Sequence, residues 1–418
     1  MKKRILFSAI FGNILEYYDF IIYSYFSSII TRVFFPEKNS NTAALLFFVV
    51  FASGFLLRPL GGIIIGKFSD RHGRGKALNI TTLMMGFGSF IIAFTPGYHS
   101  IGVIAPLIIT FARLMQGFAQ GGEFGSATSV LIENCQENQR GFWSSWQPTT
   151  QGLSALLGSG SVLLLSTMLS EQQLNDWGWR IPFFIGGLII PLGIYIRKIS
   201  FLTDKELETD NCQELSVYDK KSLLYNWFLC FFSIMGMTIS LYILKHYVPI
   251  YSFNYLGISQ KESWMIAFFS STIAVVFSPI VGRLSDRAKN PKKIAIFGRA
   301  ILAASLIPLF YLIAHFHSSS MSIIIVSLMV LFFTIASTPD YKILPSAFPK
   351  KFRAAYFSSA YAAAVAVFGG TAALTSEWLL QITGNAMSPA YYLLISVLLS
   401  TLAIYFIKSF EECRDTSE

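Results

Sequence analysis

The stretch Gly66-Lys-Phe-Ser-Asp-Arg71 recurs almost unchanged as Gly282-Arg-Leu-Ser-Asp-Arg287, 216 residues further along a chain of 418. Each copy follows an apolar run long enough to span a bilayer, and each is followed by more basic residues. Because the offset is close to half the chain, the repeat indicates two related halves. Two membrane-embedded halves joined by a polar link are typical of secondary transporters, which bind their solute between the halves.

Long apolar runs occupy most of the chain, which is 53% hydrophobic and 13% charged. A soluble domain of this size carries about 25% charged residues. Twelve runs are long enough for a membrane-spanning helix, and they begin near residues 5, 43, 77, 103, 141, 180, 224, 262, 294, 320, 354 and 388. The runs are continuously apolar rather than alternating, which excludes a β-barrel. We therefore predict an all-α membrane protein with twelve transmembrane helices.

Basic residues gather in alternate loops and account for the net charge of +9 without a nucleic acid partner. The positive-inside rule places these loops and both termini in the cytoplasm. We predict an N-terminal six-helix bundle over residues 1–198 and a cytoplasmic linker over 199–222. A C-terminal six-helix bundle with a short cytoplasmic tail is predicted over 223–418.

The segment Gly66-Lys-Phe-Ser-Asp-Arg-His-Gly-Arg-Gly-Lys76 resembles the loop motif of the major facilitator superfamily. Other segments are similar to its metabolite–proton symporters, which include α-ketoglutarate permease and the shikimate, citrate and proline/betaine transporters. These segments are Gly12-Asn-x-x-Glu16-Tyr-Tyr-Asp19-Phe-x-x-Tyr23, Gly54-Phe-x-x-Arg58-Pro-x-Gly-Gly62, Arg113-x-x-Gln-Gly117 with Gly121-Gly-Glu123, Trp177-Gly-Trp-Arg-Ile-Pro-Phe183, Phe348-Pro-x-x-x-Arg353 and Phe368-Gly-Gly370. The resemblance implies the major facilitator fold, proton coupling and a bacterial inner membrane.

Polar residues recur at helical spacing on the first predicted helix, at Asn13, Glu16, Asp19 and Tyr23. A charge near the bilayer centre costs about 2.5–3.5 kcal/mol on insertion scales, so such residues usually face a cavity and pair. Glu16 and Asp19 are therefore candidates for proton coupling, and Glu123 on the fourth helix is a third. The alternative is that they form fixed ion pairs with neighbouring arginines.

Arg113 lies deep in the fourth predicted helix and is the first candidate for binding a solute carboxylate, because arginine binds carboxylates bidentately. Its alternative role is a salt bridge to a nearby acid. Arg58 is a second candidate, with a cytoplasmic charge network as the alternative. Tyr23 is a third, because a tyrosine ring can bind a quaternary ammonium by a cation–π contact.

The fifth and seventh helices supply the remaining binding candidates. Gln147 and Gln151 belong to a neutral polar stripe on the fifth helix, suited to hydrogen bonding in a cavity or to packing between helices. Lys245 lies in the outer part of the seventh helix and either lines the cavity or reaches the outer interface.

The repeated motif predicts a cytoplasmic gate made of charged residues. Its members are Asp70, Arg71, Arg74, Glu133, Arg140, Asp286 and Arg287. Such contacts favour one conformation when they form in that conformation only. The second copy lacks the Gly-Arg pair that follows the first, so we expect the second gate to be weaker.

These observations favour a proton-coupled symporter that imports a small organic solute by alternating access. A carboxylate metabolite is placed ahead of a zwitterion such as proline or glycine betaine, and an exporter, a transporter-like sensor and a membrane enzyme are weaker alternatives. No phosphate-binding Gly-x-x-x-x-Gly-Lys-Ser/Thr loop is present, and the five histidines are scattered. We expect no cofactor and no metal, and as partners only the solute, protons and the lipid bilayer around a monomer.

Overall fold

The structure is a computed structural model that describes residues 2–35, 50, 53–133, 135–187, 190–191, 220–316, 318–349 and 352–408. All regular structure in these ranges is helical. Most of the predicted linker lies outside them, and α12 begins at Lys220, inside the predicted linker.

The first half contains the helices up to residue 191. They are α1 (Lys2–Tyr25), α2 (Ser27–Phe34), α4 (Arg58–His72), α5 (Arg74–Phe94), α6 (Tyr98–Ile101), α7 (Ile104–Glu133), η1 (Glu137–Gln139), α8 (Arg140–Ser144), α9 (Trp146–Met168), α10 (Glu171–Gln173) and η2 (Leu174–Gly178). Residues 180–187 are also helical and begin the sixth predicted span.

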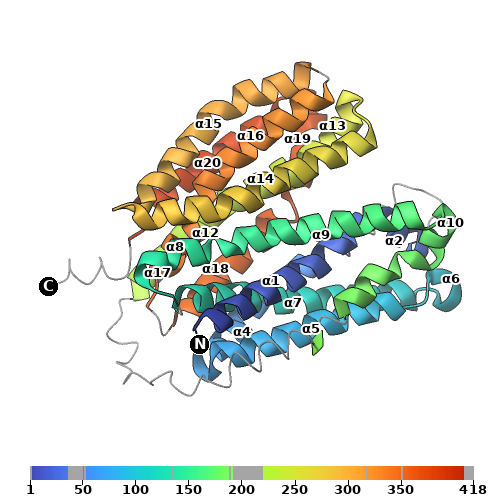
Figure 1. The fold of residues 1–418 in the computed structure, drawn as a ribbon, viewed down its shortest axis with the longest axis horizontal. Helices are drawn as coiled ribbons and strands as arrows, with labels where there is room; N and C mark the ends of the chain where they lie inside the picture. Colours follow the sequence, from blue (N-terminus) through green and yellow to red (C-terminus); the bar gives the residue numbers. More distant parts are fainter. Residues whose placement is uncertain are drawn as a thin grey trace.

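The second half contains the helices from residue 220 onward. They are α12 (Lys220–Tyr242), η5 (Ile243–Tyr247), α13 (Val248–Leu256), α14 (Gln260–Arg287), α15 (Pro291–His315), α16 (Ser319–Ser337), α17 (Asp340–Ser346), α18 (Arg353–Phe368), α19 (Ala372–Thr383) and α20 (Ser388–Phe406). Figure 1 shows the halves as two groups of long helices whose ribbons approach each other near α8, α17 and α18 and diverge toward α10 and α13.

Both copies of the repeated motif are helical rather than loops. The first forms the last turns of α4, which ends because Gly73 adopts φ 97°, a conformation that favours glycine. The second forms the end of α14. The sequence prediction of a charged loop over 66–76 is therefore wrong for residues 66–72, and a single-residue turn at Gly73 connects α4 to α5.

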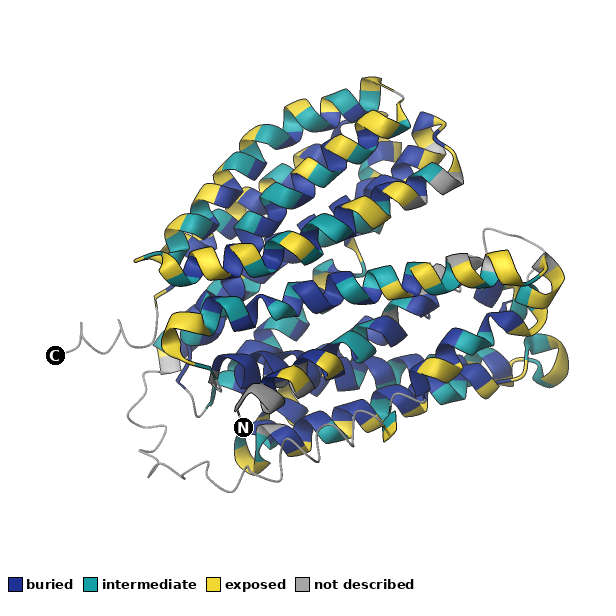
Figure 2. Cartoon of the chain, in the orientation of Figure 1, coloured by how far each residue is buried: buried dark blue, intermediate teal, exposed yellow. Residues whose placement is uncertain are grey.

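The outer surface of the described helices is suited to lipid. Large apolar side chains are exposed along α20, including Ile395, Leu402 and Tyr405, while its inner face is buried. Figure 2 shows the same alternation on the other long helices, with buried faces directed into each half. Because a water-soluble monomer rarely exposes apolar patches this large, these faces are membrane-facing.

Within the described residues, seven helices are long and apolar enough to cross a membrane. They are Gly75–Phe94, Lys221–Phe253, Met265–Arg287, Pro291–His315, Ser319–Ser346, Arg353–Thr383 and Ser388–Phe406. The other predicted spans correspond to α1, to residues 53–72, to α7, to α8 with α9, and to the segment from residue 180. All of these five except the segment from residue 180 contain polar candidate residues, and these residues lower the mean hydropathy of their helices.

Candidate functional site

A hydrogen-bond network joins α1, α7 and α9 inside the first half. The side-chain amide of Asn13 donates to the side-chain oxygens of Gln147 and Thr150. The amide of Gln147 donates in turn to Thr128 Oγ1 at 2.7 Å. Gln147 therefore links α1, α7 and α9 by hydrogen bonds, and its role in binding a solute stays a prediction.

The contact between the halves is lined by tyrosines. Gln151 Nε2 donates to the hydroxyl of Tyr17 at 2.9 Å, and this hydroxyl lies 3.5 Å from the hydroxyl of Tyr361 on α18. The ring of Tyr361 stacks on Phe124 of α7, with 3.4 Å between ring centroids. Both halves therefore contribute side chains to one polar, aromatic centre.

Two buried arginines lie in the first half. Arg113 is 0% exposed, its guanidinium lies 4.4 Å from the ring centroid of Tyr23, and it donates to Gln116 Oε1 at 2.9 Å. Arg58 lies 4.1 Å from the ring centroid of Phe55 and close to Tyr242 of the other half. The structure thus brings Tyr23 together with Arg113, and it places Arg58 beside the contact between the halves.

The three predicted proton-coupling carboxylates line one small cavity. Glu16 and Asp19 of α1 and Glu123 of α7 are all buried around it. Its remaining lining residues are Gly12, Leu15, Thr82, Met85, Gly86, Gly186 and Ile190. The cavity volume of about 10 Å³ is close to what one water molecule requires. Arg113 lies near enough to interact electrostatically with Asp19.

Lys245 lies in η5, a short π-helical segment that continues α12, and is partly buried. It lies three residues beyond Tyr242, whose side chain contacts Arg58.

Asp70 of the first motif copy contacts the other half. Its carboxylate accepts a hydrogen bond of 2.9 Å from the backbone N–H of Ala355, in the first turn of α18. A helix N-terminus presents unsatisfied N–H groups and a partial positive charge, so a carboxylate there is favourable.

Asp286 of the second copy makes the corresponding contact with the first half. Its two carboxylate oxygens accept from the backbone N–H groups of Gly141 and Phe142 at 2.6 and 2.7 Å, at the start of α8. Lys342 of α17 forms an ion pair with the same carboxylate at 2.9 Å. Asp286 therefore has three partners, and the weaker second gate stays a prediction.

The basic members of the predicted gate have other surroundings. Arg71 and Arg287 are exposed, and Arg140 pairs with Glu137 in its own loop at 3.0 Å. The side chains of Arg74 and Glu133 lie outside the described part of the structure. Among the described contacts of the predicted gate residues, Asp70 and Asp286 each accept hydrogen bonds from backbone N–H groups at the start of a helix in the other half.

Sequence reasoning missed one buried charge pair in the second half. Arg299 of α15 and Asp340 of α17 form an ion pair with exposures of 3% and 0%. The signal that singled out Arg113, one charge inside an apolar run, is also present at Arg299. Tyr361 was missed as well, because it lies in an alanine-rich stretch without a polar stripe.

No group of three or more His, Cys, Asp or Glu side chains within the described ranges is arranged to hold a metal ion. Glu16, Asp19 and Glu123, which line the small cavity, belong to the residues searched and form no such group.

Residues 10–374 match the sequence profile of the Major Facilitator Superfamily. The chain is 30% identical to a citrate-proton symporter of Klebsiella pneumoniae, with 95% of this chain and 89% of the relative covered. It is 31% identical to a proline/betaine transporter of Escherichia coli K12, covering 94% and 81%. It is 29% identical to the alpha-ketoglutarate permease of the same strain, covering 95% and 91%.

Among solved structures, the chain is similar to a proton:xylose symporter bound to 6-bromo-6-deoxy-D-glucose. The TM-score is 0.81 at 19% identity, with 100% of this chain and 99% of the other covered. It is also similar to a bacterial homologue of ferroportin in an outward-facing state, with a TM-score of 0.72 at 12% identity, covering 96% and 98%. At these identities the similarity concerns the fold of two six-helix halves.

Proposed function

The chain belongs to the Major Facilitator Superfamily, a family of multi-pass membrane transporters rather than enzymes, and from that premise we propose that it is a proton-coupled symporter importing a small organic carboxylate. We place it in a bacterial inner membrane as a monomer with both termini in the cytoplasm. The proposed bundles are residues 1–198 and 223–418, joined by the linker 199–222. Relatives named for proton symport of citrate and for α-ketoglutarate support the proposal.

The cavity lined by Glu16, Asp19 and Glu123 is the observation that supports proton coupling. A buried site of low dielectric constant disfavours charge, so a cavity lined by acidic groups is suited to taking up and releasing a proton. Arg113 interacts with Asp19, so movement of Arg113 toward a solute would change the electrostatic surroundings of this cavity.

The proposed solute site lies between this cluster and the tyrosines that line the contact between the halves. Arg113 and Arg58 supply two positive charges on the first half, and both can bind a carboxylate bidentately. Gln151, with Tyr17 and Tyr361, supplies neutral hydrogen-bonding groups from both halves. Tyr23, which lies under the Arg113 guanidinium, positions that group. Lys245, three residues beyond Tyr242, stays a further candidate for this site.

A second candidate solute is a zwitterion of the proline or glycine betaine type. The observation that favours it is the aromatic lining formed by Phe124, Tyr17 and Tyr361, since aromatic faces bind quaternary ammonium groups. One of the buried arginines would then hold the carboxylate of the zwitterion. Relatives named as proline/betaine transporters support this candidate.

The proposed gate is the pair of contacts made by Asp70 and Asp286. Both join the halves at the end where α4 and α14 finish, which the basic loops assign to the cytoplasm. In the conformation described, the cytoplasmic side is therefore closed. Breaking these contacts opens the site to the cytoplasm.

Purified protein in liposomes tests the proposal. With an inward proton gradient, we expect accumulation of a labelled organic acid that a protonophore abolishes. Glu123→Gln, Asp19→Asn and Glu16→Gln are then compared in proton-driven accumulation and in solute counterflow, which needs no net proton movement. We expect at least one of them to lose accumulation and keep counterflow.

Glu137→Gln is the matched control, because Glu137 is an exposed loop carboxylate paired with Arg140. Absence of gradient-dependent flux for a broad panel of acids and betaines would contradict the symporter proposal. Equal loss of accumulation and counterflow in all three variants would make the cluster structural. Efflux driven by the opposite gradient alone would indicate an exporter, and ligand binding without flux would indicate a sensor.

A further inference from the structure

The span Ser319–Ser346 is interrupted near the end that carries the proposed gate. α16 ends at Ser337 and α17 begins at Asp340, with a two-residue turn between them. One of the two turn residues is Pro339, which has no backbone N–H, so the carbonyl of Ile335 cannot receive a helical hydrogen bond from it. The two helices are therefore joined by a break that is suited to act as a hinge.

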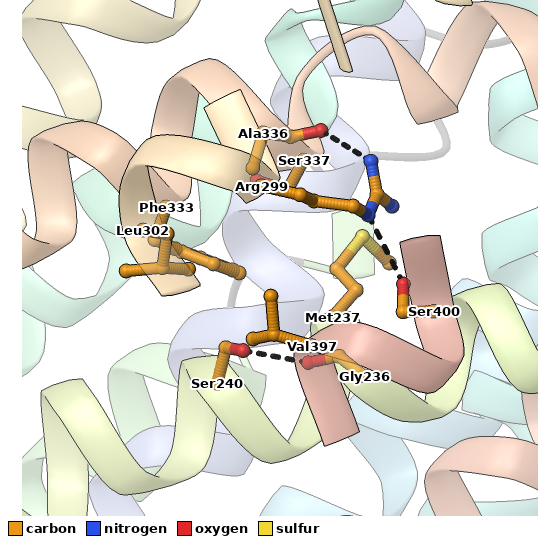
Figure 3. Close-up of a pocket in the computed structure, with 10 residues that line it drawn as sticks. All are labelled: Gly236, Met237, Ser240, Arg299, Leu302, Phe333, Ala336, Ser337, Val397 and Ser400. Carbon is orange, nitrogen blue, oxygen red and sulfur yellow. Dashed lines mark hydrogen bonds between the residues drawn. The ribbon is translucent and has the colours of Figure 1, made fainter. Parts of the chain in front are cut away.

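Arg299 of α15 contacts both sides of this break. Its guanidinium donates to the carbonyl oxygen of Ala336, in the last turn of α16, at 2.9 Å, and forms an ion pair with Asp340, the first residue of α17. Figure 3 shows the hydrogen bond to Ala336 and another, of 3.1 Å, to Ser400 Oγ of α20. Because a planar guanidinium holds several acceptors at once, Arg299 fixes the angle between α16 and α17.

Neighbouring helices keep Arg299 itself in place. Ser233 Oγ of α12 lies 3.4 Å from both the guanidinium and the Asp340 carboxylate. A Cβ added at Gly298 would lie 2.5 Å from the backbone nitrogen of Ala336, so α15 and α16 touch backbone to backbone beside the break. The guanidinium is therefore positioned by α12, α15, α16 and α20, and α17 is attached to it through Asp340.

A small cavity of about 10 Å³ adjoins the α16 side of the break. Ala336 and Ser337 line it together with Arg299, and Figure 3 shows that the other lining residues surround the same space. Protein interiors are close-packed and resist displacement, so a cavity leaves room for a small movement. The end of α16 can therefore shift at this point without overlapping its neighbours.

α17 carries side chains that contact the first half. The ring centroid of Tyr341 lies 6.1 Å from that of Phe124, and Lys342 Nζ lies 2.9 Å from the carboxylate of Asp286. Tyr341 and Lys342 directly follow Asp340 in the chain. A change in the angle at the break would therefore move Lys342 away from Asp286.

We propose that Arg299 is a positioning residue for the gate, which clamps the break between α16 and α17 and so holds Lys342 where it pairs with Asp286. Opening of the cytoplasmic side then requires α17 to turn about the break and the contact between Arg299 and Asp340 to loosen. This inference rests on the proposed gate, and it is independent of which solute is carried. Arg299 acts through α17 and contacts neither the solute nor the transported proton.

Labelling of Cys135 tests this role in the full-length protein. The thiol lies near enough to Asp286 and Lys342 to interact electrostatically with both, so its exposure reports on the gate. The clamp variant, Arg299→Met/Asp340→Asn, removes both charges and leaves neither of them buried without its partner. We expect a maleimide to label Cys135 about threefold faster or more in the clamp variant, because exposure to water makes a thiol more reactive. Mass spectrometry of the labelled peptide measures the rate.

A double-mutant cycle with Lys342→Met separates positioning of the gate from general loosening. Lys342→Met alone should speed the labelling of Cys135. It should add no further acceleration in the clamp variant, because the contact that it removes is already lost there. Any direct electrostatic effect of Lys342 on the thiol is present in both backgrounds and does not imitate this result. Acceleration by the same factor in the two backgrounds would overturn the proposal.

Leu302→Ala is the matched control for a disturbed core. Leu302 is 1% exposed, lines the same cavity and lies three residues beyond Arg299 on α15. Its truncation should lower the unfolding temperature and leave the labelling of Cys135 as in the wild-type protein. Labelling as fast in Leu302→Ala as in the clamp variant would show that any disturbance of this core opens the gate, and the positioning role would be wrong.

If the clamp variant fails to fold, Arg299→Lys takes its place in the cycle. Lysine keeps a positive charge beside Asp340 but lacks the planar fork that reaches Ala336 at the same time, so the same result with Lys342→Met is expected. Faster labelling in Lys342→Met alone, with unchanged labelling in the Arg299 variant, would overturn this inference and leave the gate standing. Unchanged labelling in both would overturn the gate as well. Failure of the proposed function would appear separately, as absence of proton-driven uptake in the wild-type protein.

Discussion

At the scale of single residues, the contacts of Arg113 in the first half constrain both the shape and the charge of its side chain. Its guanidinium combines a cation–π contact to Tyr23 with a hydrogen bond to Gln116, and it is 0% exposed. Both contacts depend on a flat, forked group, which a lysine does not provide. These contacts hold the guanidinium in position, as the proposed role in binding a solute carboxylate requires.

Arg113→Lys should raise the KM for a carboxylate solute about 10- to 100-fold, because a hydrogen bond to a charged group contributes about 1.5–3 kcal/mol. The maximal rate should change less, since lysine keeps the positive charge beside Asp19. Initial uptake rates over a range of solute concentrations measure both quantities. Arg180→Lys is the control, because Arg180 donates to the backbone oxygens of Ala93 and Thr95 at the far end of α5. An unchanged KM in Arg113→Lys would remove Arg113 from the solute site.

Sequence patterns located the charged residues better than their partners. The spacing of Glu16 and Asp19 with Tyr23 predicted a shared helix face, and Glu123 joins the first two at one cavity. The partner of Asp286 could not be predicted, because it is a pair of backbone N–H groups that any residues at 141 and 142 would offer. Tyr361 was also not predicted as a site residue, because helix packing determines which face of α18 contacts the other half.

At the scale of elements, α17 links the core of the second half to the proposed cytoplasmic gate. This short helix holds Asp340 against Arg299 and, two residues later, Lys342 against Asp286. Between them, Tyr341 packs near Phe124 of the first half, with 6.1 Å between ring centroids. Three consecutive residues therefore face the second-half core, the contact between the halves and the gate.

Lys342→Met should loosen the cytoplasmic contact, and Cys135 beside it reports the change. Burial raises the pKa of the Cys135 thiol to about 11, so little reactive thiolate exists while the gate is closed. With Cys212, Cys230 and Cys413 replaced by serine, we expect a maleimide to label Cys135 about threefold faster or more in Lys342→Met, because opening returns the thiol to water.

The electrostatic effect of the substitution on Cys135 has the opposite sign. Lys342 favours the thiolate, so its removal alone would slow labelling. Arg140→Met is the control, because Arg140 also lies near Cys135 but pairs with Glu137 of its own loop. Slower labelling in Lys342→Met would mean that the gate had stayed closed.

At the scale of the whole molecule, the halves meet backbone to backbone at Gly141 and Gly282. A Cβ added at Gly282 would lie 2.5 Å from the carbonyl oxygen of Gly141 and 2.6 Å from Ser145 Oγ. These distances are shorter than any ordinary contact, so a side chain at Gly282 requires α14 to move away from α8. Glycine at this place therefore permits the close approach of α14 and α8 on which the proposed closed state depends.

Gly282→Ala should shift the protein toward the inward-open state by about 5- to 150-fold, since overpacking costs about 1–3 kcal/mol. Solute binding from the outer face of right-side-out vesicles should weaken, and binding from the inner face of inverted vesicles should strengthen. Gly160→Ala is the control, because nothing lies within 4 Å of a Cβ at Gly160. Equal affinity changes at both faces would contradict a shift between states.

The meeting of Gly141 and Gly282 also bears on how the protein responds to the composition of the cytosol. Dissolved ions screen exposed charges strongly, but the Asp286 and Lys342 side chains are only 6% and 18% exposed, and ions do not alter the fit of two peptide backbones. The proposed contact between the halves should therefore weaken little as the ionic strength of the cytosol rises.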